Sequence, residues 1–473
     1  MPIKRADGIT ESERYLKILC DRTFLSLWSY SGVYRDQVIG KSSEGKEVCD
    51  LLVVFENHVI IFSDKDCQFP NTDRLALDWN RWFKRAIRKS ADQAWGAERW
   101  IKQSQTRLFL DRSCSIPFPI DIPDLSTARF HLIVVAHDNS MRCQQELGGS
   151  GSLIINTSIK GEDHYVRDKG GLPFLIGDID PSRTFVHVLG DASLDIVLKT
   201  LDTISDFISY LTKKEQLLRS ARLVIAAGEE DLLAYYLTNM NDVDEHDFVV
   251  PSDIVDGQIV NLCFDEGLWE DFSQSPERQA QILADRVSYV WDDLIESVSN
   301  HVLGDTQYFT THPSVKETEP LLRFLAREPR FHRRNLAESL CGLIRSAPKD
   351  MRATRYICPS SAKEPYYVFL TLPRFDWMTY EEYRETRRYV LEACCYTVKL
   401  KFPEAQHIVG IATESGFDNE GRSEDTMYVD AIDWTEEDDI RAKEASEALN
   451  ILKNPNMFTI HDQEYPLQKP TRS

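Results

Sequence analysis

Two short apolar runs lie close together near the N-terminus, within the sequence GKEVCDLLVVFENHVIIFSDKD of residues 45–66. The runs, residues 51–55 and 59–62, consist of Val, Ile, Leu and Phe, and the polar residues 56–58 separate them. Short runs of this composition are typical of strands, and a short polar break between them is typical of a hairpin loop. Because both faces of each strand are apolar, we expect the hairpin to be covered on both sides.

Charged residues flank this hairpin: Asp50 precedes the first run, and Asp64 and Lys65 follow the second. With a three-residue loop, Asp50 lies directly opposite Asp64, and the Cβ atoms of opposed residues are about 4.5–5.5 Å apart. A two-residue turn places Asp50 opposite Ser63 or Lys65 instead. Carboxylates this close repel each other unless a cation lies between them, and magnesium or manganese suits hard oxygen ligands. The pattern also fits an ordinary hairpin whose charged ends are solvated.

These residues resemble the motif of the PD-(D/E)XK nuclease superfamily, which has the restriction-endonuclease-like fold. The resemblance covers about residues 10–110. It implies that Asp50 and Asp64 bind Mg²⁺ or Mn²⁺ and that Lys65 positions or activates water. The sequence departs from the motif, because Ser63 stands where the second acid is expected and Asp64 is adjacent to the lysine. Neighbouring residues of a regular strand point to opposite faces, so Asp64 and Lys65 would not face the same site. Three alternatives remain open: a bulge that re-aims Asp64, a second acid elsewhere in the chain, or an inactive site.

Helices are predicted before and after the hairpin. Residues 9–21 form the first, and Thr10 and Glu13 have the spacing of a capping box. Residues 78–103 form the second, with Trp and Ala at helical spacing. The resemblance implies that Glu13 and Gln93 join the metal site, although Glu13 also fits a purely capping role. The start of the second helix is basic, which suits either solvent or phosphate contact; the residues are Arg81, Lys84, Arg85, Arg88 and Lys89.

Apolar patterning predicts further α/β structure beyond residue 110. Residues 128–136, ARFHLIVVA, and residues 184–189 are predicted strands, and an apolar stripe over residues 193–218 predicts one amphipathic helix. The Gly- and Ser-rich residues 139–169 are expected to form a loop. A helix over residues 320–346 is rich in arginine, which fits either an anion site or a solvated helix face; its arginines are Arg323, Arg327, Arg330, Arg333, Arg334 and Arg345.

The chain has 473 residues, which is too long for one hydrophobic core. We therefore predict an α/β protein in three parts. Residues 1–218 form a restriction-endonuclease-like mixed sheet flanked by helices, with its core at about residues 10–110. Residues 219–300 form a helical middle region, and residues 319–473 form a C-terminal α+β domain.

The composition is that of a soluble globular protein, with 42% hydrophobic and 28% charged residues. No apolar run is long enough to span a bilayer, and the N-terminal residues do not resemble a signal peptide. The ten cysteines include no Cys-x-x-Cys pair, which argues against a zinc ribbon or a disulfide framework and favours a reduced compartment. We therefore expect a cytoplasmic protein that does not bind membranes.

The net charge of −21 argues against a general basic coat for nucleic acid. The charge is uneven, however, because residues 1–110 contain 18 Lys and Arg against 15 Asp and Glu, a net charge of +3. The remainder of the chain has a net charge of −24. The nuclease-like segment therefore tolerates a polyanion best, and the acidic C-terminal region suits a protein partner or a homo-oligomer contact.

Two hypotheses of function follow. The first is a metal-dependent endonuclease that acts on DNA rather than RNA and, by analogy, serves a bacterial defence system against foreign DNA. No segment of the chain predicts base reading, so recognition would depend on phosphate, DNA shape or a partner. The second is a nuclease-like scaffold that binds nucleic acid or protein without cleavage. Two carboxylates at one point beside the lysine would favour the first, and an Asp64 that points away would favour the second.

Overall fold

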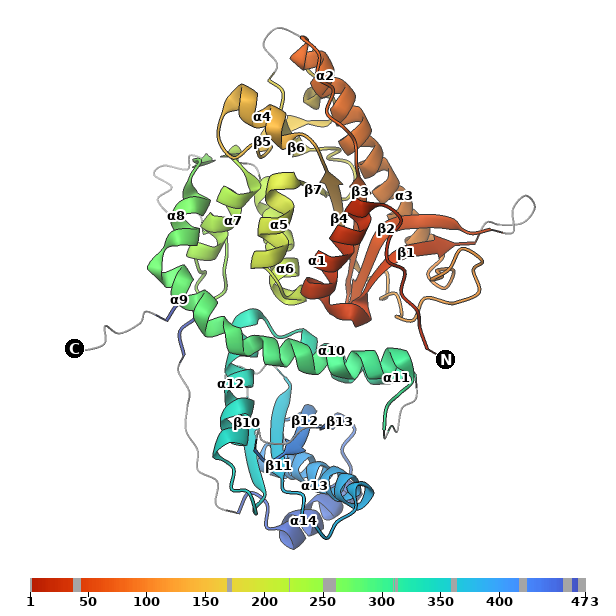
Figure 1. The fold of residues 1–473 in the computed structure, drawn as a ribbon, viewed down its shortest axis with the longest axis vertical. Helices are drawn as coiled ribbons and strands as arrows, with labels where there is room; N and C mark the ends of the chain where they lie inside the picture. The colour runs from red at the N-terminus through yellow and green to blue at the C-terminus, as the bar shows by residue number, and fades with distance from the viewer. Residues whose placement is uncertain are drawn as a thin grey trace, which may run out of the picture. The chain divides into compact units, whose positions relative to one another are not determined.

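The structure of the chain is a computed structural model, and the chain divides into two compact units (Figure 1). The first contains residues 1–282, 294–318 and 467–473, and the second contains residues 283–293 and 319–466. Residues 219–300, predicted as a separate helical region, are thus divided between the two units. The structure describes residues 2–36, 44–167, 172–220, 222–249, 261–308, 310, 314–358, 364–416, 423–453 and 462–466.

The mixed α/β architecture is confirmed, with an N-terminal sheet of five strands flanked by helices and a helical middle region. The sheet has the order β1-β2-β3-β4-β7. Strands β1, β2 and β3 are antiparallel neighbours, whereas β3, β4 and β7 run parallel, so their carboxyl ends meet at one edge. The strands are β1 (Ser29–Arg35), β2 (Lys46–Phe55), β3 (His58–Lys65), β4 (Arg129–Ala136) and β7 (Val186–Gly190).

Strands β2 and β3 form the predicted hairpin, but its turn has two residues, because Phe55 pairs with His58. The three-residue loop is therefore wrong, and Asp50 does not lie opposite Asp64. The same register, continued along the strands, brings Asp50 level with Ser63, which is the alternative that a two-residue turn predicts. The tight turn requires a positive φ at its first residue, as type I′ and II′ turns do, and Glu56 has a φ of 51°.

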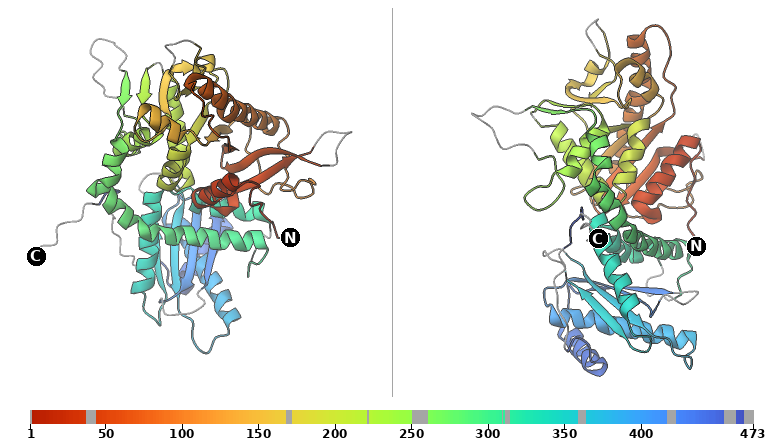
Figure 2. Two further views of the ribbon diagram at one scale, coloured as in Figure 1. Left: turned by 45° about the horizontal axis from the view of Figure 1, so that its top comes forward. Right: turned by 60° about the vertical axis from the view of Figure 1, so that its left-hand side comes forward.

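Helices cover both faces of the five-stranded sheet (Figures 1 and 2). Helix α1 (Glu11–Trp28) packs on one face, and Thr10 and Glu13 form the predicted capping box at its start. The predicted helix over residues 78–103 is confirmed on the other face. It consists of three consecutive segments, α2 (Leu75–Trp82), the π-helical η1 (Phe83–Arg88) and α3 (Lys89–Gln103).

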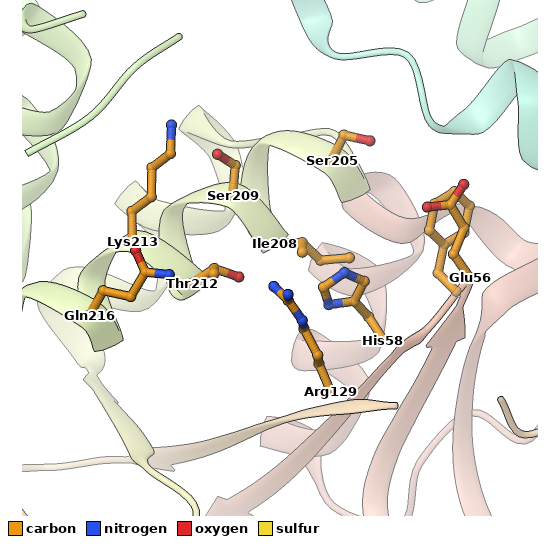
Figure 3. A pocket seen from close by; sticks show the side chains of 10 residues that line it. Glu56, His58, Arg129, Ser205, Ile208, Ser209, Thr212, Lys213 and Gln216 are labelled. Atoms are coloured by element: carbon orange, nitrogen blue, oxygen red, sulfur yellow. The ribbon is translucent and has the colours of Figure 1, made fainter. Parts of the chain in front are cut away.

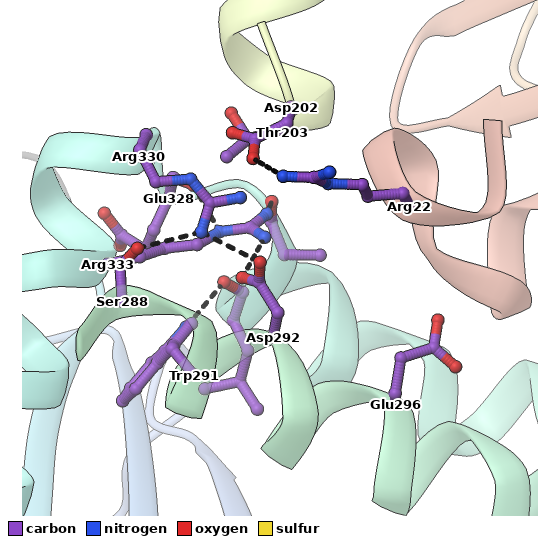
Figure 4. Close-up of polar contacts among 12 residues, drawn as sticks. Arg22, Asp202, Thr203, Ser288, Trp291, Asp292, Glu296, Glu328, Arg330 and Arg333 are labelled. Atoms are coloured by element: carbon purple, nitrogen blue, oxygen red, sulfur yellow. Dashed lines mark hydrogen bonds and ion pairs between the residues drawn. The ribbon is translucent and has the colours of Figure 1, made fainter. Parts of the chain in front are cut away.

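The prediction of one helix over residues 193–218 is wrong. The segment forms α5 (Asp191–Thr200) and α6 (Ile204–Leu218), and both contact α1. Thr203 begins α6 by accepting a hydrogen bond from the backbone N–H of Asp206, and Asp202 forms an ion pair with Arg22 (Figure 4). Periodicity could not reveal this break, because the apolar stripe continues across it, whereas the Thr203–Asp206 capping spacing could have done so.

The expected loop over residues 139–169 is also wrong within the described residues 139–167. It contains α4 (Ser140–Leu147), β5 (Ile154–Lys160) and a 3₁₀ turn, η2 (Gly161–His164). Strand β5 belongs to a second sheet, of order β6-β5-β8-β9. The sequence IINTSIK of β5 mixes polar and apolar residues, so its apolar pattern is too weak to predict a strand. The partner strands are β6 (Leu175–Asp178), β8 (Val224–Ala226) and β9 (Leu262–Phe264).

The middle region is mostly helical. Its helices are α7 (Glu229–Thr238), α8 (Leu268–Gln274), α9 (Pro276–Ala284), the 3₁₀ turn η4 (Asp285–Ser288) and α10 (Tyr289–Gly304). Helix α11 (Val315–Ala326) follows this region. Within the described ranges, no helix has the combination of length and apolar character needed to cross a membrane.

The second unit contains a four-stranded mixed sheet of order β10-β11-β12-β13. Helix α13 connects the parallel strands β11 and β12. The hydrophobic core between the helix and the sheet includes Val368, Leu391 and Ile408. The elements are α12 (Arg330–Ser346), β10 (Ala353–Ile357), β11 (Tyr366–Leu372), α13 (Tyr380–Lys401), β12 (His407–Glu414), β13 (Glu424–Asp430) and α14 (Glu436–Leu449).

Three arginines of α12 do not belong to a solvated helix face, because they are buried against carboxylates of the same unit. Arg333 and Arg330 donate to Asp292 over 2.7 and 2.8 Å (Figure 4). Arg334 donates to Asp285 over 3.1 Å. Carboxylates already neutralise these cations inside the unit, so the alternative of an anion site is not supported for them either. The sequence does not predict this pairing, because the carboxylate partners lie about forty residues earlier in the chain. Arg333 and Asp292, for example, are 41 residues apart.

We expect Arg333→Met to lower the free energy of unfolding of the second unit by about 3 kcal/mol, because it removes one partner of a buried ion pair. Urea denaturation followed by tryptophan fluorescence measures this loss. The matched control is Arg345→Met near the end of the same helix, where the side chain is exposed and the expected change is within about 0.5 kcal/mol. Equal effects of the two substitutions would contradict the assignment.

Candidate active site

Asp50 lies where β2 and β3 separate. The ladder between these strands ends at the pair Leu51–Phe62, whereas β2 continues alongside β1 as far as Lys46. The Asp50 side chain reaches across the gap, and its Oδ2 accepts a hydrogen bond of 2.6 Å from the backbone N–H of Asp64. The structure therefore brings the carboxylate of Asp50 against the backbone of Asp64.

The pKa of Asp50 is raised to about 7. Burial of the carboxyl group contributes most to this rise, and the negative charges of Glu47, Glu13 and Asp64 add to it, while the hydrogen bond from the Asp64 N–H opposes it. Asp50 is thus a partly buried acid among other acids. Strongly perturbed carboxyl groups cluster at functional sites, so Asp50 is the leading candidate for a functional residue.

The side chain of Asp64 points away from the gap, toward β4. Its Oδ1 is 2.6 Å from Nε2 of His137, and Nδ1 of the same ring is 2.8 Å from Oδ1 of Asp191. Asp64 is the last residue but one of β3, His137 directly follows β4, and Asp191 directly follows β7, so the three side chains meet at the carboxyl edge of the parallel strands. Sequence reasoning missed His137 and Asp191. Their positions just after two predicted strands were the available signal, because ligands bind at this edge of α/β sheets.

His137 is held in its protonated form. Burial alone lowers the pKa of its imidazole, but the hydrogen bonds to Asp191 and Asp64 and the charges of both carboxylates outweigh burial and raise the pKa to about 10. The imidazolium therefore neutralises Asp64 in the absence of any metal. The Asp64 side chain is only 1% exposed, and its Oδ2 has no hydrogen-bond partner among the described residues.

Lys65 and Ser63 lie on the face of the sheet opposite to Asp64. Phe62 contacts Phe24 of α1, with ring centroids 6.0 Å apart, and residues alternate between faces along a strand. Asp64 therefore faces the side of α1, whereas its two neighbours face the side of α3. The pairing of β3 with β4 shows no bulge up to Lys65 that could re-aim Asp64. The structure does not bring the lysine amine and the Asp64 carboxylate together.

Glu13 and Gln93 do not meet Asp50 through side-chain contacts in the described part of the chain. Glu13 Oε2 accepts hydrogen bonds from the backbone N–H groups of Ile9 and Thr10, at 2.6 and 3.2 Å. It therefore caps α1 and influences Asp50 only through its charge. Gln93 lies on the exposed face of α3, whereas the buried face of that helix packs toward the sheet.

The oxygens near the gap fit a partial metal site rather than a complete one. In the parts of the chain that the structure describes, no three His, Cys, Asp or Glu side chains are arranged to hold a metal ion. Mg²⁺, however, is usually bound by one or two carboxylates together with water and substrate phosphates. A buried acceptor without a partner, such as Asp64 Oδ2, requires an explanation, and an ion or a water molecule is one. At the gap itself, Asp50 is the carboxylate that could hold Mg²⁺ or Mn²⁺, whereas the expected second ligand, Asp64, lies on the other face of the sheet and pairs with His137.

Hydrogen bonds of Trp82 hold the basic part of the long helix next to the carboxyl edge of the sheet. Its Nε1 donates to the carbonyl oxygens of His137 and Cys67, at 3.0 and 3.1 Å. Arg88, in contrast, lies over the ring of Trp95. The exposed basic residues around Trp82 form a surface that we call the basic helix surface; it consists of Arg81, Lys84, Arg85 and Lys89.

Compared with known proteins, the chain matches no protein-family model, no curated protein and no solved structure. The site combines Asp50 at the strand gap, the buried Asp64–His137–Asp191 network and the basic helix surface.

We expect Asp50→Asn to stabilise the protein at pH 8 in EDTA by about 1–4 kcal/mol. The folded-state pKa of about 7 lies above the ordinary value of 3.8, so the protonated carboxyl group is favoured in the folded state. The stability that Asp50 contributes is therefore present at low pH and lost as the pH rises through about 7. The neutral amide avoids this loss.

Urea denaturation at pH 4 and pH 8 tests this expectation, and the two proteins should differ little at pH 4. Asp66→Asn is the matched control, because Asp66 is exposed and its substitution should change stability by less than about 0.5 kcal/mol at either pH. A destabilising effect of Asp50→Asn at pH 8 would contradict the role of burial.

Proposed function

We propose that this protein is a metal-dependent nuclease that hydrolyses phosphodiester bonds of DNA, with its site at the gap between β2 and β3. The observation that supports this function best is Asp50, a carboxyl group whose pKa is raised to about 7 among neighbouring acids. It lies in a mixed sheet flanked by helices, which is the arrangement that the resemblance to the PD-(D/E)XK superfamily implies.

In this proposal Asp50 holds Mg²⁺ or Mn²⁺ together with water and phosphate oxygens of the substrate, and Asp64, whose carboxylate is paired with His137 on the other face of the sheet, is not a ligand. A divalent cation at this position would lower the pKa of Asp50. Such an ion, when bound, polarises the scissile phosphate and lowers the pKa of a water molecule. Lys65, on the same strand, would orient that water or stabilise negative charge on the phosphate. His137 would keep Asp64 in place through its hydrogen bond.

The basic helix surface would bind the DNA backbone. Its side chains are exposed and lie on the helix that Trp82 anchors to the site. Lysine and arginine contacts to phosphate provide affinity without reading sequence. By analogy, such an enzyme would act on foreign DNA in a bacterial defence system, where the acidic C-terminal region would bind a protein partner or a second copy of the chain.

The second candidate function is a nuclease-like scaffold that binds nucleic acid or protein without cleaving it. The specific observation in its favour is the orientation of Asp64, which points away from the gap and pairs with protonated His137, so that the carboxylate is neutralised without a metal. Lys65 and Asp64 lie on opposite faces of the sheet, and this separation favours the same function. A scaffold would bind DNA through the basic helix surface and would show no metal-dependent cleavage.

A cleavage assay separates the two functions. Purified protein is incubated with plasmid, single-stranded DNA and RNA, with Mg²⁺, Mn²⁺ or EDTA. We expect cleavage of DNA only with a divalent cation, and Asp50→Ala should reduce its rate by about 100-fold or more, because it removes a charged group from the site of phosphate activation.

The control for this assay is Asp66→Asn, which changes the charge of an exposed neighbour and should leave the rate unchanged. Cleavage that survives Asp50→Ala would place the activity elsewhere. Absence of cleavage by the wild type under every condition would favour the scaffold.

The basic helix surface is tested by binding rather than cleavage. In EDTA, Lys84→Gln combined with Lys89→Gln should weaken the binding of duplex DNA and reduce the slope of log K against log salt by about 2, because each lost phosphate contact removes about 0.9 from the slope. Fluorescence anisotropy measures both quantities. Lys160→Gln combined with Lys443→Gln changes the net charge equally at two exposed positions outside this surface and should preserve the slope. An equal loss in both double variants would exclude a localised phosphate contact.

A further inference from the structure

A cavity of about 320 Å³ lies at the amino end of β3, at the other end of this strand from Asp64 (Figure 3). The hairpin turn, His58 at the start of β3, Arg129 at the start of β4 and one side of α6 line it. Its volume is near the lower end of the range of about 300–1,000 Å³ that is usual for small-molecule sites. The cavity is separate from the candidate active site and is not needed for the proposed cleavage.

The charge of the cavity lining differs from that of the chain. Its charged residues are Arg129, Lys213 and Glu56, so histidine aside the lining has one more basic than acidic residue in a chain with a net charge of −21. Lys213 is already engaged, with its amine 3.5 Å from a carboxylate oxygen of Glu245. The described residues provide no carboxylate partner for Arg129, whose exposed guanidinium is therefore available to an anion.

A pair of neutral histidines adds a second donor. His58 Nδ1 and His131 Nε2 are 2.9 Å apart. Burial lowers the pKa of both rings, to about 4 for His58, where the charge of Arg129 contributes, and to about 3 for His131, where the charges of His58 and Arg129 contribute. Near neutral pH each ring therefore has one N–H, and one of the two facing nitrogens donates to the other.

The buried environment of His131 decides which nitrogen donates. If His58 Nδ1 were the donor, the hydrogen of His131 would lie on its Nδ1, which is buried without a partner among the described residues. An unpaired buried N–H is costlier and rarer than an unpaired acceptor. His131 Nε2 is therefore the donor, and the hydrogen of His58 lies on Nε2, at the edge of the ring away from His131.

A hydroxyl group completes the set of donors. Thr212 Oγ1 on α6 is buried and has no hydrogen-bond partner among the described residues. Figure 3 shows Arg129 and His58 side by side, directed toward the part of α6 that contains Ile208 and Thr212. A guanidinium, an imidazole N–H and a hydroxyl thus face one space, and Ile208 and Phe55 provide its apolar side.

We propose that this cavity binds a small phosphomonoester of mononucleotide size. Arg129, His58 Nε2–H and the Thr212 hydroxyl hold the phosphate group, and the apolar side chains contact the organic part. A phosphomonoester suits these donors better than a carboxylate because it presents three terminal oxygens, and the planar guanidinium pairs with two of them. The site is a second ligand site of the first unit, and its occupation does not depend on nuclease activity.

Isothermal titration calorimetry on the full chain tests this proposal, with adenosine 5′-monophosphate, ribose 5-phosphate, inorganic phosphate and adenosine as probes. We expect the two phosphomonoesters to bind with one-to-one stoichiometry and more tightly than inorganic phosphate, and adenosine not to bind. Arg129→Gln should weaken the binding of both phosphomonoesters at least tenfold, and Thr212→Val should weaken it to a smaller extent. Lys160→Gln, which removes an exposed charge outside the cavity, should leave the affinity unchanged.

Three results would overturn the proposal: no binding of either phosphomonoester, binding that Arg129→Gln leaves unchanged, or equal binding of adenosine. Circular dichroism shows whether each variant is folded, and Arg129→Gln should be, because the side chain is exposed. Nitrogen-15 NMR of the His58 ring provides an independent readout. A hydrogen found on Nδ1 rather than Nε2 would remove His58 from the set of donors.

Discussion

The hydrogen-bonded network Asp64–His137–Asp191 fixes the carboxyl edge of the first sheet. It joins the ends of three adjacent parallel strands, with distances of 2.6 and 2.8 Å on the two sides of one imidazole ring. Two carboxylates next to a ring that is shielded from water stabilise its protonated form more than burial destabilises it. The orientation of Asp64, and therefore the separation of its carboxylate from Lys65, depends on this network.

Across the residues that the structure describes, Asp50, at the gap between β2 and β3, has no cation beside it of the kind that His137 provides for Asp64. It receives one backbone hydrogen bond, and burial and the charges of other acids, not a cation, dominate its surroundings. A carboxyl group in this environment reduces stability when it ionises, and functional sites commonly contain such groups because their chemistry requires them. The contrast between a neutralised Asp64 and an uncompensated Asp50 distinguishes the structural acid from the candidate functional one.

The register of the hairpin connects these two situations. The side-chain period of a strand is two, so a shift of one residue exchanges the faces of every side chain. The two-residue turn brings Asp50 level with Ser63 and leaves Asp64 on the other face, beside His137. The buried arginines of the second unit are neutralised as Asp64 is, by an oppositely charged side chain. Arg333 is tolerated in the interior only because Asp292 is placed against it.

Local features could be predicted from the sequence because they depend on residues close together in the chain. The two strands of the hairpin, the capping box of Thr10 and Glu13 and the long helix after the hairpin are of this kind. Only the tertiary structure decided which charges meet. Asp64 and His137 are 73 residues apart, and their contact depends on the order of strands in the sheet, which no short-range pattern specifies. The sequence by itself therefore determined the local elements around the hairpin and the position of Asp50 beside the buried run of residues 51–55. The packing of distant strands determined that Asp64 pairs with a histidine, because electrostatic partners are selected by distance in space.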